Sequence, residues 1–400
     1  MAESKETLKA FQADVAAWMK EHVPADPGFL LPLSFLEVGT EQQLDFLRAW
    51  QHKVWEAGFL GMHWPTEYGG QGADPAYQGI VDREMARCNA PIMFNTIGLG
   101  WTGPLLLEMG TDAEKSKYLK HILSGDEIWC QGFSEPDHGS DLGAVQTKAV
   151  RDGDEYVING SKIWTTLGNY ADHMILLART DPTAERKYDG LSFFLSPMKV
   201  AGVDAVPIRK VTGEYGFNQV FFTDTRIPAD TLMVGEGKGW GVAMKTLEYE
   251  RGVTAGQATG HWMVAIEIDD LINDLRGFER DGAPVFDDPA VRDEAVGLIM
   301  EAKALSLSAR RMGVPALTSD FPMGLPLSSK YRGTEWSRRM KLFGAAMQGA
   351  RGSLYVEDPN AHRGGFWQRA YFSNFGATIG GGTSQVQANI IAEHVLGLPK

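Results

Sequence analysis

The spacing of hydrophobic and polar residues changes twice along this chain and divides it into three segments. Up to about Leu123, apolar residues recur every three to four positions, as they do in amphipathic helices. From Glu127 to about Leu232, short runs rich in β-branched and aromatic residues alternate with turn residues, which is typical of strands. Helical spacing returns at Val242. We therefore predict an α+β protein with a β-domain over residues 127–235, between helical domains over residues 1–126 and 236–400.

The same patterns predict individual helices, turns and loops. Helices are predicted over residues 42–57, 75–88, 103–110, 113–123, 242–276, 289–311, 328–348 and 384–396. The dipeptides Asp152-Gly153 and Asn159-Gly160 predict hairpin turns between strands. Residues 61–72 are too rich in Gly and Pro to form the interior of an element, and residues 350–365 are predicted to be irregular.

Composition and charge narrow the class of protein. The 44% hydrophobic and 22% charged fractions are typical of a globular protein, and no stretch approaches the length of apolar chain needed to span a membrane. A formal net charge of −13 argues against nucleic acid or an anionic membrane as partner. Cys88 and Cys130 have no metal or CxxC spacing, and the N-terminus lacks the pattern of a secretory signal. We expect a cytoplasmic protein.

The stretch Leu247–Gly252 places two glutamates and an arginine on the helix predicted over residues 242–276. Glu250 shares a helical face with small and apolar residues, where desolvation would raise its pKa toward that of a useful base. That face consists of Ala243, Thr246, Leu247, Glu250, Val253, Thr254 and Gln257. Glu248 and Arg251 are three positions apart, close enough to pair or to hold one polar ligand. Taken alone, the stretch is more simply read as a solvated, ion-paired surface.

A search for known catalytic motifs leaves one region of the β-domain. The sequence has no phosphate-binding GxxxxGK[ST] loop, no GxGxxG between a strand and a helix, no HExxH and no GxSxG, and its nine histidines lack metal-ligand spacing. What remains is Phe133–Asp141 followed by Gly160–Thr166. Turn hydrogen bonds would explain Ser134 and Ser140 individually, and core packing would explain Trp164. Together they supply the hydroxyl donors and flat ring that a planar heteroaromatic cofactor with a pyrophosphate tail requires.

Five motifs, in order along nearly the whole chain, resemble those of the acyl-CoA dehydrogenase family. They are Trp64-Pro-Thr-Glu-Tyr-Gly-Gly-Gln-Gly72, Ser134-Glu-Pro-Asp-His-Gly-Ser-Asp141, Asn159-Gly-Ser-Lys-Ile-Trp-Thr-Thr166, Gly235-Glu-Gly-Lys-Gly-Trp240, and the ending from Gly381-Gly-Thr-Ser-Gln385 to Pro399. The resemblance implies a three-domain fold with an N-terminal α-helical domain, a middle β-barrel and a C-terminal four-helix bundle. It also implies an FAD cofactor and a place in lipid catabolism.

The resemblance assigns cofactor contacts to residues of this chain. The matching positions are Gln131, Phe133, Ser134, Ser140, Trp164, Thr166, Arg280, Thr383 and Gln385. Ser140 would also contact the thioester substrate, Trp164 would lie near the isoalloxazine, and Thr166 would bond toward its N5. Arg280, Thr383 and Gln385 match positions that reach FAD across a subunit boundary, so a homodimer or a dimer of dimers is expected. The Arg280 region and Phe343–Gly349 depart from the usual family pattern.

The family reaction removes the α-proton of an acyl-CoA while a β-hydride passes to the flavin. In many members the base precedes the Gly-Thr of the C-terminal motif, where this chain has Gly381. Other members, such as isovaleryl-, long-chain- and steroid-type enzymes, carry the base on a helix before an Arg, and here that position is Glu250. Glu248 and Arg251 match residues that bind CoA. The resemblance thus implies α,β-dehydrogenation of a branched or bulky acyl-CoA, with electrons passed to an electron-transfer flavoprotein.

Other activities of the same fold stay open at this point. An oxidase would differ by admitting O2 to the reduced flavin, which sequence does not reveal. A desulfinase should lack the base that Glu250 supplies. An inactive subunit of a heteromeric enzyme is disfavoured by the intact Ser134, Trp164 and Thr383, and a nucleic-acid-binding relative by the net charge of −13.

Overall fold

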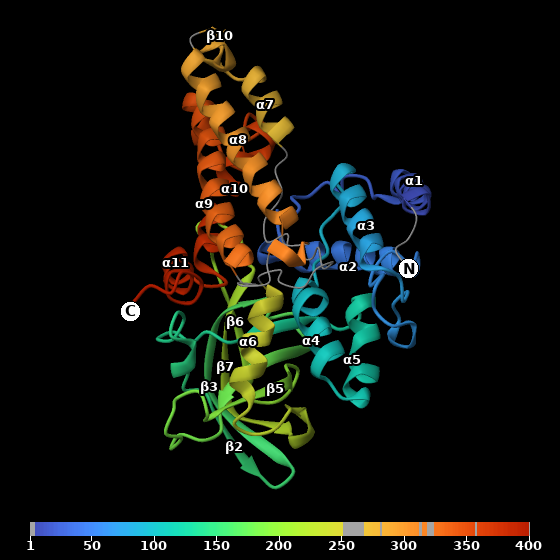
Figure 1. Ribbon diagram of the computed structural model, residues 1–400, viewed down its shortest axis with the longest axis vertical. Helices are drawn as coiled ribbons and strands as arrows, with labels where there is room; N and C mark the ends of the chain where they lie inside the picture. Colours follow the sequence, from blue (N-terminus) through green and yellow to red (C-terminus); the bar gives the residue numbers. More distant parts are fainter. Residues whose placement is uncertain are drawn as a thin grey trace. The chain divides into compact units, whose positions relative to one another are not determined.

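The chain forms two compact units, Met1–Gly260 and His261–Lys400 (Figure 1). The computed structural model describes residues 5–250, 268–280, 282–311, 314–317, 324–356 and 358–399. Among these residues, no helix combines the length and the apolar composition that crossing a membrane requires. The order of elements is helical, then β, then helical, as the sequence predicts.

The first unit begins with α-helices. They are α1 (Lys5–His22), α2 (Glu41–Glu56), α3 (Pro75–Arg87), α4 (Gly103–Met109) and α5 (Asp112–Ser124). The hydroxyl of Thr111 accepts a hydrogen bond from the Glu114 backbone, and the Glu114 carboxylate accepts from the Thr111 backbone, so α5 starts with a capping box. A π-helical turn, η3 (Gly98–Thr102), leads directly into α4. The predicted helices match α2 to α5 within one residue at each end.

An eight-stranded sheet follows. Its strands are β1 (Trp129–Gly132), β2 (Lys148–Asp152), β3 (Glu155–Thr166), β4 (His173–Arg179), β5 (Leu191–Pro197), β6 (Val203–Ile208), β7 (Phe217–Pro228) and β8 (Leu232–Met233). The strand order is β6-β7-β3-β2-β4-β5-β8, and β1 pairs with β4 in parallel. The turn at Asp152-Gly153 is confirmed, because Asp152 pairs with Glu155 across a tight hairpin.

The hairpin predicted at Asn159-Gly160 is wrong. Both residues lie inside β3, where the pairing with β7 shifts register between Ile158 and Gly160. Gly160 has a φ of +147°, and the Asn159 side chain exchanges hydrogen bonds with Asp224 of β7 at 3.0 and 2.9 Å. The extra residue of this β-bulge lies in β7, where Asp224 has a φ of +46°, and the dipeptide lies opposite it in β3.

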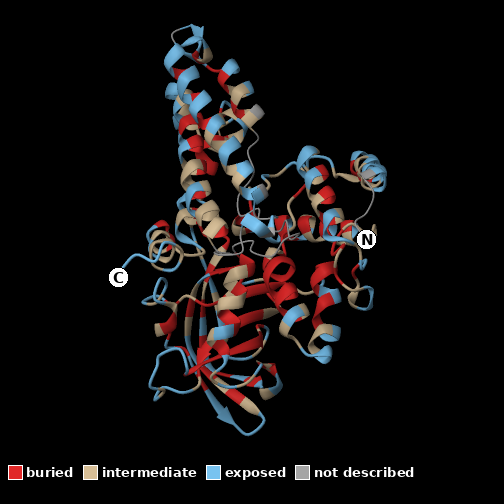
Figure 2. Ribbon diagram, in the orientation of Figure 1, coloured by how far each residue is buried: buried red, intermediate tan, exposed pale blue. Residues whose placement is uncertain are grey.

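The helices and the sheet of the first unit share one hydrophobic core (Figure 2). Leu44 and Leu47 of α2 belong to the same buried cluster as Ile158 of β3 and Leu176 of β4. Burying two element types against each other explains why helices and sheet form a single compact unit. The domain boundaries at residues 126/127 and 235/236 stay predictions.

Helix α6 (Gly239–Glu250) follows the sheet and packs against β4, β5, η3 and α4. It begins at a glycine because a side chain at Gly239 would come within 2.4 Å of the Ser192 backbone in β5. The long helix predicted over residues 242–276 is described as α6 and α7 (Ile268–Gly277). Residues 251–267 lie outside the described part of the chain.

The second unit is helical. Besides α7 it contains α8 (Pro289–Arg311), α9 (Gly324–Met347), α10 (Phe366–Ile379), α11 (Ser384–Ile390) and a short hairpin of β9 (Glu279–Arg280) and β10 (Ala283–Pro284). Helix α9 packs between α8 and α10. The periodicity did not predict α10, because its buried face includes the polar Asn374, 1% exposed, while Phe375 faces outward at 37% exposed.

Candidate active site

A bulge in β3 turns Trp164 outward. Between Lys162 and Thr165, the pairing of β3 with β7 shifts by one residue, and Trp164 has a φ of +62°. That conformation is rare for a bulky residue, and such bulges redirect side chains beside active sites. The indole is 56% exposed and meets the edge of Phe217 at a ring-centroid distance of 6.0 Å. The bulge thus presents a flat aromatic ring at the surface of the sheet.

Buried Lys162 connects this bulge to the loop that carries Ser134. Its ammonium donates hydrogen bonds to the Phe133 carbonyl at 3.0 Å and to the Glu135 carboxylate at 2.8 Å. The backbone N–H of Ile163 donates to the Ser134 carbonyl at 2.9 Å. Ser134 and Trp164, which the sequence separates by thirty residues, are therefore held side by side on neighbouring backbone segments.

The Lys162–Glu135 pair is buried, and hydrogen bonds reach both of its charged groups. Burial lowers the pKa of Lys162 to about 8, although the Glu135 carboxylate opposes this shift. Burial tends to raise the pKa of Glu135, but Lys162 and the backbone N–H groups of Gln146 and Thr147 hold it below its usual range. Sequence reasoning did not single out this pair. The available signal was strand parity, because Lys162 alternates in step with the buried Tyr156 and Ile158.

The other predicted cofactor contacts of the first unit lie around the same loop. Gln131 is partly exposed in β1, and Phe133 is buried with its ring edge-to-face against Phe193 at 5.9 Å. Thr166 is buried at the end of β3, whereas Ser140 is exposed in the loop before β2. The structure thus gathers Gln131, Phe133 and Ser134 at the end of β1, and Trp164 and Thr166 at the end of β3.

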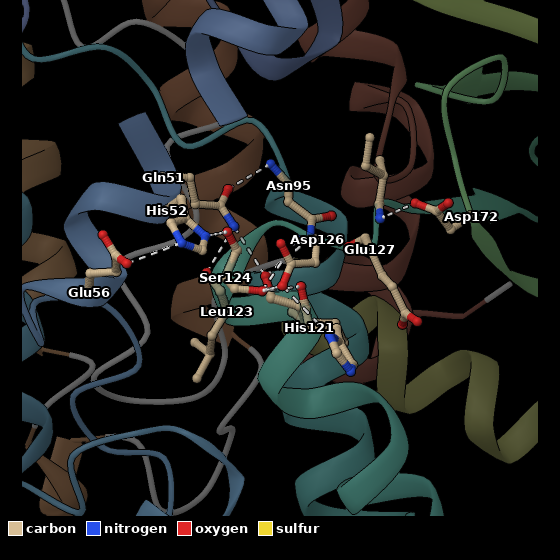
Figure 3. Close-up of polar contacts among 12 residues, drawn as sticks. Gln51, His52, Glu56, Asn95, His121, Leu123, Ser124, Asp126, Glu127 and Asp172 are labelled. Atoms are coloured by element: carbon tan, nitrogen blue, oxygen red, sulfur yellow. Dashed lines mark hydrogen bonds and ion pairs between the residues drawn. The ribbon is translucent and has the colours of Figure 1, made fainter. Parts of the chain in front are cut away.

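A buried amide network, of which Figure 3 shows Gln51 and Asn95, fixes β1 to the helices. The Asn95 side chain donates to the carbonyls of Ile122 at 3.2 Å and Glu127 at 2.9 Å, and it accepts from the Trp129 backbone at 3.1 Å. The Gln51 side chain accepts from the Asn95 backbone at 3.3 Å. Gln51 and Asn95 are fully buried, so losing one partner would leave a buried polar group unsatisfied. The network anchors the strand that leads into Ser134.

Glu250 ends the described part of α6 and is only 5% exposed. Ala243 and Thr246, on the same helical face, are completely buried, as the periodicity predicts. Glu248 lies on a different face: its side chain is 41% exposed and pairs with Lys245 at 3.3 Å. The partner predicted for Glu248, Arg251, lies outside the described residues, as do the face positions Val253, Thr254 and Gln257.

In the second unit, a glycine tract precedes α11. Gly381 and Gly382 have φ of +66° and +90°, and their carbonyls accept hydrogen bonds from the side chains of Gln387 at 2.7 Å and Lys330 at 2.5 Å. Thr383 caps α11 by accepting from the Val386 backbone at 3.1 Å. The predicted contact Gln385 is exposed on the first turn.

Arg280 is exposed in the β9–β10 hairpin. Its guanidinium lies 4.0 Å from the Met347 sulfur. An exposed arginine is available to bind an anionic group, which is compatible with the predicted contact to a pyrophosphate.

The first-unit residues fit a flavin. An exposed indole beside a serine loop can contact one face and one edge of a planar ring, and the buried ion pair fixes the two segments without using the Trp164 side chain. Among the described residues, no cluster of His, Cys, Asp and Glu could hold a metal ion.

Comparison with known proteins identifies the family. Residues 5–126, 130–225 and 237–396 match the N-terminal, middle and C-terminal domains of acyl-CoA dehydrogenases. The acyl-CoA dehydrogenase IpdE1 of Mycobacterium tuberculosis is 36% identical over 396 residues, which cover 98% of each protein. This chain belongs to the acyl-CoA dehydrogenase family. The predicted family, and the fold with a β-domain between helical domains, are confirmed.

Solved structures of acyl-CoA dehydrogenases resemble the whole chain. The Tcur3481-Tcur3483 steroid ACAD matches with a TM-score of 0.83 and 30% identity, covering 100% of this chain and 99% of that one. The ChsE4-ChsE5 complex of Mycobacterium tuberculosis matches with a TM-score of 0.78 and 25% identity over 100% of both chains. As a member of this family, the chain is a flavin-dependent oxidoreductase that acts on acyl-CoA thioesters.

Proposed function

We propose that this acyl-CoA dehydrogenase family member introduces a double bond between Cα and Cβ of a bulky acyl-CoA and that Glu250 is the base. The observation that carries the proposal is the position of Glu250, a carboxyl group only 5% exposed on the buried face of α6. A carboxylate shielded from water is suited to remove a weakly acidic α-proton. The alternative family position is Gly381, which offers no titratable group.

We propose FAD as the flavin. Its contacts would be Gln131, Phe133, Ser134, Ser140, Trp164 and Thr166 from the first unit and Arg280, Thr383 and Gln385 from the second. When bound, the flavin accepts the hydride that leaves Cβ. The residues around it hold the ring, and Lys162 supports this by fixing the Ser134 loop to β3.

Substrate binding would use the loop before β2 and the exposed side of α6. Ser140 is exposed and free of regular secondary structure, which suits contact with a thioester. Glu248, with its side chain 41% exposed, and Arg251 would meet the CoA moiety. These roles rest on the family resemblance.

A steroid-like acyl group is the best-supported substrate class. The structural relative described as a steroid ACAD is 30% identical over the whole chain. The tract Gly380–Gly382 has no side chains, so in the proposed site it would occupy little volume beside the acyl chain. Both observations favour a branched or bulky acyl group over a short straight one.

We further propose that the enzyme works as an assembly and passes electrons to an electron-transfer flavoprotein. Contacts from Arg280, Thr383 and Gln385 would reach the FAD of a neighbouring subunit. A second copy of this chain would give a homodimer or a dimer of dimers. The two-part names of the Tcur3481-Tcur3483 and ChsE4-ChsE5 relatives support a second possibility, a partner subunit of different sequence.

An anaerobic substrate screen tests the proposed function. The purified, flavin-loaded protein is mixed with acyl-CoAs that carry straight, branched and steroid-derived acyl groups, and flavin absorbance is followed. We expect fast bleaching with a bulky acyl-CoA and slow or no bleaching with butyryl-CoA. If no acyl-CoA bleaches a correctly bound flavin, the proposed activity is wrong. If straight chains react fastest, the proposed substrate class is wrong.

A further inference from the structure

Glu108, near the end of α4, holds two residues of α6 at once. One carboxylate oxygen accepts a hydrogen bond from the Tyr249 hydroxyl, and the other lies 2.9 Å from the Lys245 ammonium. Lys245 also pairs with Glu248 at 3.3 Å and lies 5.6 Å from the centre of the Tyr249 ring. We refer to Glu108, Lys245 and Tyr249 as the α4–α6 clamp.

The electrostatics of the clamp favour its charged form. The hydrogen bond from Tyr249 and the neighbouring Lys245 hold the pKa of Glu108 below its usual range. Burial and the Glu108 carboxylate raise the pKa of Tyr249, so the phenol keeps the proton that it donates. Tyr249 is only 6% exposed, and its hydroxyl would lose a partner if Glu108 moved away. The clamp is therefore closed at neutral pH.

The clamp contacts the last described turn of α6, where it can fix the orientation of the Glu250 side chain. Lys245 and Tyr249 are four residues apart, so Glu108 contacts α6 at two points about one helical turn apart. Two such attachments restrict both rotation and sliding of the helix end. Glu250 directly follows Tyr249, and successive side chains on a helix point about 100° apart around its axis. A rotation of this helical turn would therefore change the direction in which the Glu250 carboxylate points.

We propose that Glu108 is a positioning residue that aims Glu250 at the substrate through Tyr249 and Lys245. The inference rests on the proposed role of Glu250 as base. Glu108 lies in α4, 142 residues before Glu250 in the sequence, and its contacts are to neighbours of Glu250 on α6. Its effect is therefore on the orientation of the base.

The test compares Tyr249→Phe and Glu108→Gln with the wild-type flavoprotein, using the acyl-CoA that bleaches the flavin fastest. Tyr249→Phe keeps the buried ring and removes only the hydrogen bond to Glu108. We expect flavin reduction at saturating substrate to slow by about 10- to 100-fold in both variants, because a small displacement of a catalytic group has effects of this size. In Tyr249→Phe, KM and flavin affinity should stay within about twofold, because this change leaves the Lys245–Glu248 pair in place.

Tyr156→Phe is the matched control. Tyr156 is 1% exposed and also donates its hydroxyl to a carboxylate, that of Glu236 before α6. Its variant loses the same kind of bond and should reduce the flavin at the wild-type rate. Equal slowing in Tyr156→Phe and Tyr249→Phe would overturn the inference, because it would reflect a general loss of stability.

Two further measurements separate positioning from other roles. The double variant Glu108→Gln/Tyr249→Phe should be no slower than the worse single variant, because both changes open the same clamp. Additive losses would contradict a shared clamp. Glu250→Gln tests the base separately: if it is inactive while Tyr249→Phe is fully active, the clamp inference fails and the proposed function stands. If Glu250→Gln is fully active, the proposed base fails, and with it the role of the clamp.

Discussion

At the scale of single residues, Asp82 in α3 is a partly buried residue whose carboxyl we expect to destabilise the folded chain at neutral pH. Burial raises its pKa to about 6 from an ordinary value of 3.8, despite a hydrogen bond from Gln78 at 3.1 Å. Its second oxygen is buried without a hydrogen-bond partner among the described residues. Because the folded state holds this proton more tightly, its contribution to stability falls as pH rises from about 4 to 6 and stays unfavourable above.

Asp82→Asn should therefore stabilise the protein at pH 7.5 but much less at pH 4.5. We expect a gain of roughly 1 to 3 kcal/mol at the higher pH, since one pKa unit corresponds to about 1.4 kcal/mol. Thermal unfolding of both proteins at the two pH values measures the difference. An equal gain at both pH values would show that the ionisation of Asp82 is not its cause.

A second prediction at this scale concerns Lys162. Lys162 and Glu135 have 0% and 7% of their side-chain surface exposed. Lys162→Met would leave the carboxylate buried without its cation, which costs about 3 to 5 kcal/mol. The variant should unfold at lower temperature and lose flavin more readily. Adding Glu135→Gln should restore part of the stability, and no recovery would argue that Lys162 acts through packing alone.

At the scale of elements, we expect Trp164 in the bulge of β3 to contribute to cofactor binding and little to the stability of the fold. A left-handed conformation costs a non-glycine residue roughly 1 to 2 kcal/mol. Because Trp164 is 56% exposed, removing its side chain loses little buried apolar surface. Trp164→Gly relieves the strain but adds about 0.5 to 1 kcal/mol of backbone entropy. We expect the unfolding midpoint of the flavin-free protein to change little, while flavin affinity falls. Trp164→Phe is the control that keeps a ring, and a large loss of stability in Trp164→Gly would show that the indole is structural.

Local patterns in the sequence predict most elements but not all. Clear periodicity predicts α2 to α5 within one residue of their observed ends. Periodicity does not predict helix α10, because the polar Asn374 lies on its buried face. There the Asn374 side chain forms hydrogen bonds with Lys341 and Ser337 of α9 at 2.8 and 3.2 Å. Asn159-Gly160 is read wrongly because one dipeptide serves both turns and bulges, and only the partner strand decides between them.

The sequence also predicts some features of the candidate site and misses others. Periodicity correctly predicts that Glu250 is buried with Ala243 and Thr246, because a helical face is a local property. The sequence does not reveal Lys162 as the link between Ser134 and Trp164, or Glu108 as a partner of Tyr249. These pairs depend on how distant segments pack, and no local spacing encodes that contact.

At the scale of the whole molecule, the proposed contacts of Arg280, Thr383 and Gln385 with the FAD of a neighbouring subunit predict an assembly. The purified chain should elute as at least a dimer, and Arg280→Ala should weaken FAD retention without unfolding the chain, because Arg280 is exposed. Light scattering with size-exclusion chromatography and the ratio of flavin to protein measure both. A monomer that retains one FAD per chain would contradict the shared cofactor site.

The most direct test of Glu250 as base is rapid mixing of acyl-CoA with Glu250→Gln under anaerobic conditions. The glutamine keeps the size of the buried side chain but cannot accept a proton. We predict that this variant binds flavin and acyl-CoA as the wild type does, yet reduces the flavin at least about 100-fold more slowly, since a lost general base has an effect of this order. Flavin bleaching at the wild-type rate in Glu250→Gln would contradict the assignment and place the base on another residue.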